Sequence, residues 1–303
     1  MSAQPLAAGR PATSTSTRSA YLAWIVVCLV WGTTYLAIRI ALETVPPLLM
    51  AGFRWTTAGA LIVAVLAARG EPLPPPRTWP ALALLGVLLI GFGNGAVVWA
   101  EQTVPSGLTA VLVAAVPFWM VGLERFMAAP EPLTPRRIGG LLVGFAGIVL
   151  LVWPELRDAP GNAFLTGVLA TQLACVGWAF GSSLSRRREP GENVLATAAL
   201  QMLFGGICML VAGSVLQEWK ALSFTGRTAG AVTYLVLAGS VAGFSAYAYA
   251  LKHLPVATVS LYAYVNPVIA VVLGTLLLGE PLNPRLAVAG AIVLTGIALV
   301  RGR

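Results

Sequence analysis

Arg54 is the residue whose type and position most directly suggest ligand chemistry. It stands in the apolar stretch LLMAGFRWTTAGAL, and if a helix begins near residue 47, Arg54 lies about 10 Å along it at about 1.5 Å per residue. An ionisable side chain in apolar surroundings is costly and usually has a function or a partner. Two interpretations stay open: the guanidinium binds a substrate carboxylate, or it is structural, bonded to helix-end carbonyls or paired with Glu43.

Aromatic and amide side chains inside apolar stretches are the other candidates for a binding pocket. Asn94 and Asn266 need hydrogen-bond partners, either on neighbouring helices or on a polar substrate. Rings in the same stretches would suit an aromatic or large apolar ligand, and helix packing is the competing explanation for each of them. The candidate substrate-binding residues are Trp31, Tyr35, Arg54, Asn94, Trp99, Trp119, Trp178, Tyr247, Tyr249, Tyr262 and Asn266.

Carboxylates are absent from the middle of every apolar stretch. They fall at stretch ends or between stretches, and Glu124 lies within about one turn of such an end. The chain therefore offers no mid-stretch carboxylate to carry a proton or to attract a cation. We expect a neutral or zwitterionic ligand, and we favour facilitated diffusion or weak coupling over obligatory proton antiport.

Other chemistries find little support. An intramembrane hydrolase would need a buried aspartate pair or a serine with a base, yet the single histidine, His253, stands at a stretch end, and Ser214 and Ser240 have no base nearby in the sequence. We interpret both serines as packing residues and the chain as a non-enzyme. The three cysteines lack metal-ligand spacing and are interpreted as small core residues, so we expect no disulfide, no metal and no cofactor.

The composition identifies the solvent of these residues. Of 303 residues, 58% are hydrophobic and 10% charged, with a mean hydropathy of +0.84, whereas soluble domains carry about 25% charged residues. Strand alternation is absent, and backbone groups in lipid must be satisfied within helices. The sequence predicts an all-α polytopic membrane protein. Its ten transmembrane helices are expected near 20–41, 47–68, 79–100, 105–127, 137–153, 163–185, 194–216, 228–251, 255–279 and 285–301, each able to cross a core about 30 Å thick.

Basic residues indicate the orientation in the membrane. If the N-terminus is cytoplasmic, thirteen Lys and Arg fall on that side and five on the other, with Arg54 inside a span. The positive-inside rule then predicts that both termini are cytoplasmic. The net charge of +8 does not indicate nucleic-acid binding, because the basic residues are scattered among loops and span ends.

The chain is an internal duplication. EPLTPR at 131–136 returns as EPLNPR at 280–285, and Trp31 and Trp178 stand 147 positions apart. At the same offset Arg54 matches the neutral Gln201. Five spans form one unit, so the second copy must enter the membrane from the opposite side, as in the inverted repeats of many secondary transporters. We expect a disordered tail at 1–19 and two inverted five-helix repeats at 20–153 and 163–301.

Four residues are candidate hinges or gates. Proline within a helix removes a backbone hydrogen bond, and glycine permits close helix approach or bending. Tight static packing is the competing explanation. The candidates are Gly93, Pro117, Gly243 and Pro267, which pair at an offset of 150 between the repeats.

Several motifs, in order along the chain, resemble the EamA-type carriers of the drug/metabolite transporter superfamily. They are WGTTYLAIRIALETVPPLLMAGFRW, GLTAVLVAAVPFW, GEPLNPR and AGAIVLTGIALV. The resemblance implies ten spans with both termini inside, a central cavity built mainly from spans 1–4 and 6–9, and peripheral fifth and tenth spans. Known members export amino acids and other small metabolites, and a bacterial branch exports aromatic amino acids.

The sequence therefore predicts an alternating-access carrier of the bacterial cytoplasmic (inner) membrane. The expected cargo is an amino acid with an aromatic or large apolar side chain, and the alternative is another small neutral metabolite or drug. The expected partners are this small molecule and the lipid bilayer, without nucleic acid. Monomer and homodimer both stay open.

Overall fold

The computed structural model describes residues 14–124, 134–157, 162–187, 193–254, 256–260, 262–279 and 284–301, and their regular structure is helical. Much of the two repeated turns, residues 131–133 and 280–283, lies outside the described residues. The first repeat contains α1 (Ser14–Ala41), α2 (Pro47–Ala68), η1 (Pro76–Thr78), α3 (Trp79–Gly86), η2 (Val87–Asn94), α4 (Gly95–Ala100), α5 (Ser106–Val113), α6 (Val116–Glu124) and α7 (Pro135–Arg157). The second contains α8 (Asn162–Arg186), α9 (Val194–Val215), η3 (Glu218–Ala221), α10 (Gly226–Tyr234), η4 (Leu235–Ala242), α11 (Gly243–His253), α12 (Val256–Val259), α13 (Tyr262–Leu278) and α14 (Pro284–Arg301).

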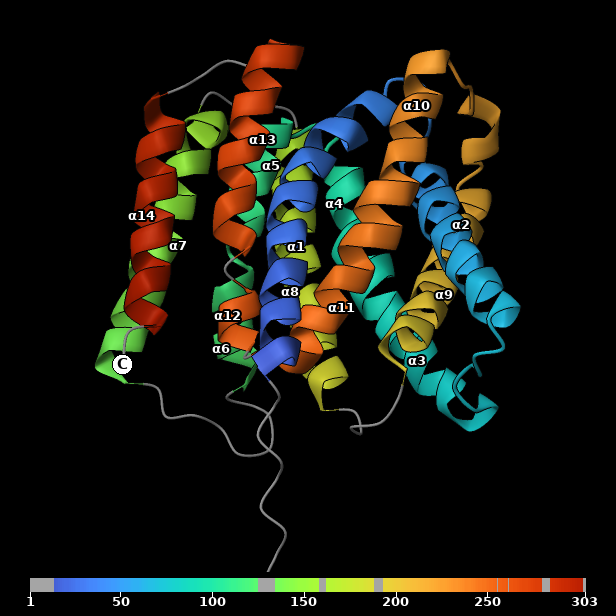
Figure 1. Cartoon of the computed structure of the whole chain (residues 1–303). Coiled ribbons are helices and arrows are strands. Elements are labelled where there is room, and N and C mark those ends of the chain that lie inside the picture. The colour runs from blue at the N-terminus through green and yellow to red at the C-terminus, as the bar shows by residue number, and fades with distance from the viewer. Residues whose placement is uncertain are drawn as a thin grey trace, which may run out of the picture.

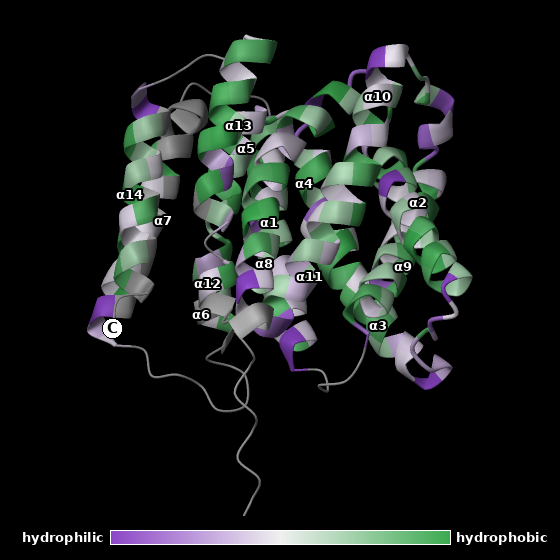
Figure 2. Cartoon of the chain, in the orientation of Figure 1, coloured by the Kyte–Doolittle hydropathy of each residue, from purple (hydrophilic) through white to green (hydrophobic). Residues whose placement is uncertain are grey.

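Six described helical segments are long and apolar enough to cross a membrane: 17–41, 47–68, 76–100, 162–186, 194–215 and 226–253. Three further apolar segments are shorter and cover 106–120, 265–278 and 287–296. Hydrophilic residues gather toward the two ends of the bundle and hydrophobic residues cover its middle, as Figure 2 shows. This distribution is the one that a lipid bilayer imposes on a helical bundle.

The assignment of residues 14–19 to a disordered tail is wrong, because α1 already begins at Ser14. Once a helix is nucleated, each added residue gains a backbone hydrogen bond. The helix therefore extends beyond the apolar stretch into the polar residues that precede it.

The two repeats run in opposite directions. In Figure 1 the third span of the first repeat rises from α3 to α4, whereas its counterpart descends from α10 to α11. In the fourth spans α5 lies above α6, but α12 lies below α13. The first turn of α1 and the last turn of α14 lie at the same end of the bundle. This is the geometry that an odd number of spans per repeat requires.

The repeats pack against each other reciprocally. In the first repeat α1 packs on α11 and α13, which are the third and fourth spans of the second repeat. Conversely, α8 packs on η2, α4, α5 and α6, the third and fourth spans of the first repeat. The first helix of each repeat therefore packs against helices of the other repeat. Both repeats border the space between α1 and α8.

Two helix pairs pack tightly, α2 with α9 and α7 with α14. They lie on opposite lateral sides of the bundle in Figure 1. A Cβ atom on Gly206 of α9 would collide with the backbone of Thr56, and one on Gly296 of α14 would collide with the backbone of Gly144. Small residues allow this close approach, which gives helices in lipid much of their association energy.

One helix start is completed by the other repeat. Pro46 precedes α2 without a side-chain cap. Instead, the Glu218 carboxylate accepts hydrogen bonds from the backbone nitrogens of Leu48 (3.3 Å) and Leu49 (2.9 Å). A carboxylate is favoured at a helix N-terminus because it satisfies free N–H groups and complements the helix dipole.

Candidate functional site

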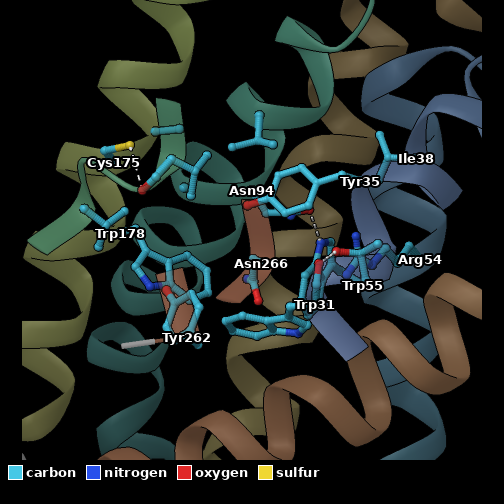
Figure 3. A pocket seen from close by; sticks show the side chains of 16 residues that line it. Trp31, Tyr35, Ile38, Arg54, Trp55, Asn94, Cys175, Trp178, Tyr262 and Asn266 are labelled. Carbon is cyan, nitrogen blue, oxygen red and sulfur yellow. Dashed lines mark hydrogen bonds between the residues drawn. The ribbon is translucent and has the colours of Figure 1, made fainter. Parts of the chain in front are cut away.

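A pocket with an empty volume of about 580 Å³ lies between α1 and α8, with contributions from both repeats. Figure 3 shows Arg54 and Trp55 on one side, Cys175 and Trp178 on the opposite side and Asn266 between them. Its lining is formed by Trp31, Thr34, Tyr35, Ile38, Arg54, Trp55, Gly93, Asn94, Val97, Val113, Val116, Ala174, Cys175, Trp178, Tyr262 and Asn266. On α1 the lining residues run from Trp31 to Ile38, so the pocket lies along the C-terminal part of this helix.

The guanidinium of Arg54 is held by one hydrogen bond and one ring contact. Arg54 is 2% exposed, and its Nε donates to the hydroxyl of Ser240 at 2.7 Å. Its Cζ lies 4.5 Å from the ring centroid of Trp55, a cation–π distance. Among the described residues, Nη1 is buried without a hydrogen-bond partner. A buried guanidinium nitrogen without a partner is costly, and a carboxylate in the pocket would supply one.

The proposed structural partners of Arg54 are not the observed ones. Glu43 pairs with Arg227 instead, with 3.1 Å between the carboxylate and Nε at the bundle surface. The Nε bond to Ser240 also corrects the interpretation of that serine as a packing residue. The repeat counterpart Gln201 is buried in α9 and does not line the pocket.

An aromatic cluster closes the pocket toward the N-terminal half of α1. The ring of Trp31 lies 5.4 Å from that of Trp178, 5.1 Å from that of Tyr247 and 5.1 Å from that of Tyr262, centroid to centroid. The pairs with Trp178 and Tyr262 are edge-to-face, an arrangement that is favourable beyond its buried area. The indole Nε1 of Trp31 donates to the carbonyl of Gly239 at 3.0 Å, and Tyr247 shares a 2.7 Å hydrogen bond with Ser182.

Both amides that line the pocket are held by hydrogen bonds. Asn94 accepts a 2.7 Å hydrogen bond from Nε1 of Trp55. Asn266, with its amide oriented to satisfy its neighbours, donates to the carbonyls of Cys28 (3.0 Å) and Tyr262 (3.1 Å). Since both donors of the Asn266 amide are then in use, its carbonyl oxygen acts as an acceptor, and the neighbouring Tyr35 is within reach of this side chain.

Eight of the predicted residues line this pocket: Trp31, Tyr35, Arg54, Gly93, Asn94, Trp178, Tyr262 and Asn266. Tyr247 lies behind the lining, within the aromatic cluster. Trp99, Trp119 and Tyr249 do not line it. The indole of Trp119 is 38% exposed and donates to Gln172, and Tyr249 stacks on His253 at 4.2 Å.

Span depth alone does not decide which side of a helix faces this pocket, which explains why these three residues lie outside its lining. The same limit applies to Cys208, which is exposed on α9 instead of buried like Cys28 and Cys175. Trp55 was missed although it follows Arg54 directly and lies equally deep in its span. The small lining residues Ala174, Val113 and Val116 carry no sequence signal that separates them from ordinary span residues.

The third span of each repeat contains a π-helical segment, η2 and η4. Such wide turns are rare and often mark functional sites. Gly93 belongs to η2, and Gly243 directly follows η4. A Cβ on Gly93 would stand 2.9 Å from Cε3 of Trp178, and one on Gly243 would stand 2.9 Å from Cδ1 of Trp31. Each central tryptophan therefore rests on the glycine of the opposite repeat.

The two candidate hinge prolines lie in different local structures. Pro117 stands in the first turn of α6, just after a break at Ala114 and Ala115. Pro267 lies inside the continuous helix α13. In the second repeat α12 ends at Val259 and α13 begins at Tyr262, eight and five residues before this proline.

Glu101, counted among the carboxylates outside the spans, follows the last residue of α4 but is fully buried. This burial could not be predicted from the sequence, because it depends on the helices packed around the span end. Among the described residues no group of three His, Cys, Asp or Glu side chains is arranged to hold a metal ion.

In each repeat one arginine connects the ends of two helices by hydrogen bonds. Arg39, at the end of α1, donates to the carbonyl of Glu101 at the end of α4. Arg186, at the end of α8, donates to the carbonyls of Leu251 (3.2 Å) and Leu254 (2.6 Å) at the end of α11. The bonds to Glu101 and to Leu251 are repeat equivalents, and a cation is favoured at the C-terminal carbonyls of a helix.

The comparisons with known proteins agree with this architecture. The inner membrane transporter YedA of Escherichia coli K12 is 38% identical over 277 residues, covering 90% of this chain and 87% of YedA. The transporter YvbV of Bacillus subtilis 168 is 26% identical over 94% of this chain and 92% of its own. Protein PecM of Dickeya dadantii is 27% identical over 90% and 89%.

A solved crystal structure has the same fold, with a TM-score of 0.68 and 25% sequence identity over 94% of this chain and 96% of the other. The EamA-like transporter family matches twice, at residues 18–153 and 165–302, so the match itself repeats with the duplication. The chain belongs to the EamA-like transporter family.

Proposed function

We propose that this protein is a secondary carrier that exports amino acids with aromatic or large apolar side chains by alternating access. The observation that carries the proposal is the pocket shared by the two repeats, whose lining combines the buried Arg54 with aromatic rings. A transporter family identifies small-molecule transport as the activity, and the chemistry of this pocket suggests the cargo.

The polar groups of the pocket suit a zwitterion. The Nη1 of Arg54 is a donor for a carboxylate, and the carbonyl oxygen of Asn266 is an acceptor for an ammonium group. The rings of Trp31, Trp178 and Tyr262 offer apolar faces for the ligand's side chain.

The reciprocal packing of inverted repeats supports alternating access. Two similar halves can exchange conformations at little net free-energy change, which turns one pocket toward either side of the membrane. We propose ten spans, namely the six long segments, the three shorter apolar segments and α7, with both termini in the cytoplasm. By analogy with YedA we place the protein in the inner membrane.

The pocket lining contains no carboxylate among the described residues, which supports facilitated diffusion or weak proton coupling. Glu101 is the group that tests this preference, since it is a fully buried carboxylate. A fixed number of protons per transported molecule, lost in Glu101→Gln, would contradict it.

A carrier for other small neutral metabolites or drugs is the second candidate. It is favoured by the lining itself, in which Arg54 is the only charged side chain among the described residues.

Uptake of labelled compounds into proteoliposomes separates the two candidates. We expect aromatic amino acids to be transported and to compete with one another, while their decarboxylated amines compete poorly. Arg54→Ala should abolish this preference, and Trp99→Ala, a change outside the pocket, serves as the control. Transport of uncharged compounds with no uptake of amino acids would refute the proposed cargo.

A further inference from the structure

We propose that Ser240 is a positioning residue that orients Arg54 for the carboxylate of the substrate. This inference rests on the proposed function, because it requires a carboxylate at Arg54. It assigns a role to a serine on the second repeat, whereas Arg54 belongs to the first.

The first step is the geometry around the guanidinium. The Ser240 hydroxyl lies 2.7 Å from Nε of Arg54, and both residues are buried, Ser240 at 0% and Arg54 at 2% exposure. Trp55 lies under the guanidinium. A guanidinium is a rigid planar fork of five donors. Once Nε is bonded and one face is covered, the direction of the two terminal nitrogens is fixed.

The second step is the space next to Ser240. A Cβ added to Gly239 would stand 3.0 Å from Nη2 of Arg54, so the backbone of η4 closely approaches the guanidinium. The fork is therefore bounded by Ser240 and Gly239 on one side. Since the hydrogen bond to Ser240 uses Nε alone, the terminal nitrogens are the donors that remain for a ligand, and Nη1 is without a partner among the described residues.

The third step is the position of Ser240 in the fold. It lies in the π-helical segment η4, whose Gly239 carbonyl also accepts the indole hydrogen bond of Trp31. Two adjacent residues of the second repeat thus hold two pocket residues of the first. Orientation of a ligand-binding group by a second hydrogen bond is the arrangement that makes polar recognition specific.

The pocket offers no support for a nucleophilic role of this serine. Its hydroxyl accepts the guanidinium N–H, and the chain's only histidine, His253, stacks on Tyr249 at the end of α11. Losing the hydroxyl should therefore change carboxylate recognition and leave the capacity to move other ligands.

The test compares tryptophan with tryptamine, its decarboxylated amine, in proteoliposomes that contain the full chain. Ser240→Ala should raise the KM for tryptophan roughly 10-fold, since a hydrogen bond to a charged group is lost, with the maximal rate changed less than about twofold if the transition between states is unaffected. The KM for tryptamine should stay the same. The matched control is Ser245→Ala, which removes a buried hydroxyl without a hydrogen-bond partner from the same span.

A second pair of variants allows the test to be decided even if Ser240→Ala misfolds. Thr and Val have nearly the same shape and differ in the hydroxyl, so Ser240→Thr should keep the preference for tryptophan and Ser240→Val should lose it. Equal effects of Thr and Val, or equal losses for tryptophan and tryptamine, would overturn the role of Ser240. Absence of tryptophan uptake by the wild-type protein would instead refute the proposed function and this inference with it.

Discussion

The two central tryptophans occupy matched positions but make different contacts. Trp31 approaches Gly243 with the pyrrole edge of its indole and donates Nε1 to Gly239. Trp178 approaches Gly93 with its six-membered ring, and no hydrogen bond of normal geometry is found for its Nε1 among the described residues. In an inverted-repeat carrier the opposite state is reached when the halves exchange conformations. We therefore expect the contacts that only one of the two tryptophans makes to change between the two states of the carrier.

The largest difference between the repeats should appear at Arg54 and Gln201. Arg54→Gln makes the first repeat resemble the second and removes the cation from the pocket. Affinity for an aromatic amino acid should fall about 100-fold, since truncating a buried charge contact costs about 3 kcal/mol or more.

The matched variant Gln201→Ala should change the same affinity less than about threefold, because the side chain lies outside the pocket. Binding of a labelled amino acid to purified protein checks both values. A similar loss of affinity in the two variants would contradict the prediction that only the first repeat supplies the carboxylate-binding residue.

The glycine contacts should give the next largest effect. Gly243→Ala and Gly93→Ala each insert a methyl group against an indole, which should destabilise the protein by about 1–3 kcal/mol. We expect the larger loss at Gly243, because displacing Trp31 also breaks its bond to Gly239. Thermal unfolding in detergent measures both, and an equal decrease in Tm would contradict the asymmetry.

The indole hydrogen bond itself should have a smaller effect. Trp31→Phe keeps an aromatic ring but removes Nε1, so it should lose about 1 kcal/mol from the observed state. Trp178→Phe should destabilise this state less, because no hydrogen bond of normal geometry is found for its Nε1 among the described residues. Cysteine accessibility from each side of sealed vesicles would show whether Trp31→Phe shifts the population toward the other state, and no shift would exclude a switching role.

The smallest effects are expected outside the pocket. Trp99→Ala and Trp119→Ala should leave the KM for an aromatic amino acid within about twofold, as for surface positions away from a site. Transport kinetics check this. A loss as large as that in Trp31→Ala would return these residues to the list of ligand contacts.

The fold was readable from the sequence because lipid reduces the choices. Apolar length predicts helices, and the offset between Trp31 and Trp178 predicts the inverted duplication. The same reasoning identified Arg54, Asn94 and Asn266, since a polar group in an apolar helix must have a partner.

The details of the pocket depended on helix rotation and on contacts between the repeats. Trp99 and Trp31 look equivalent by depth, and only packing separates them. The burial of Glu101 and the bond from Arg54 to Ser240 arise between segments far apart in the sequence, which no local pattern records.

The arginine bonds at the span ends have a mechanical consequence. Arg39 ties α1 to α4, and Arg186 ties α8 to α11. If the protein alternates between two states as proposed, a transition that preserves these bonds must move α1 with α4, and α8 with α11, as rigid pairs. Bending is then expected between the pairs and not within them.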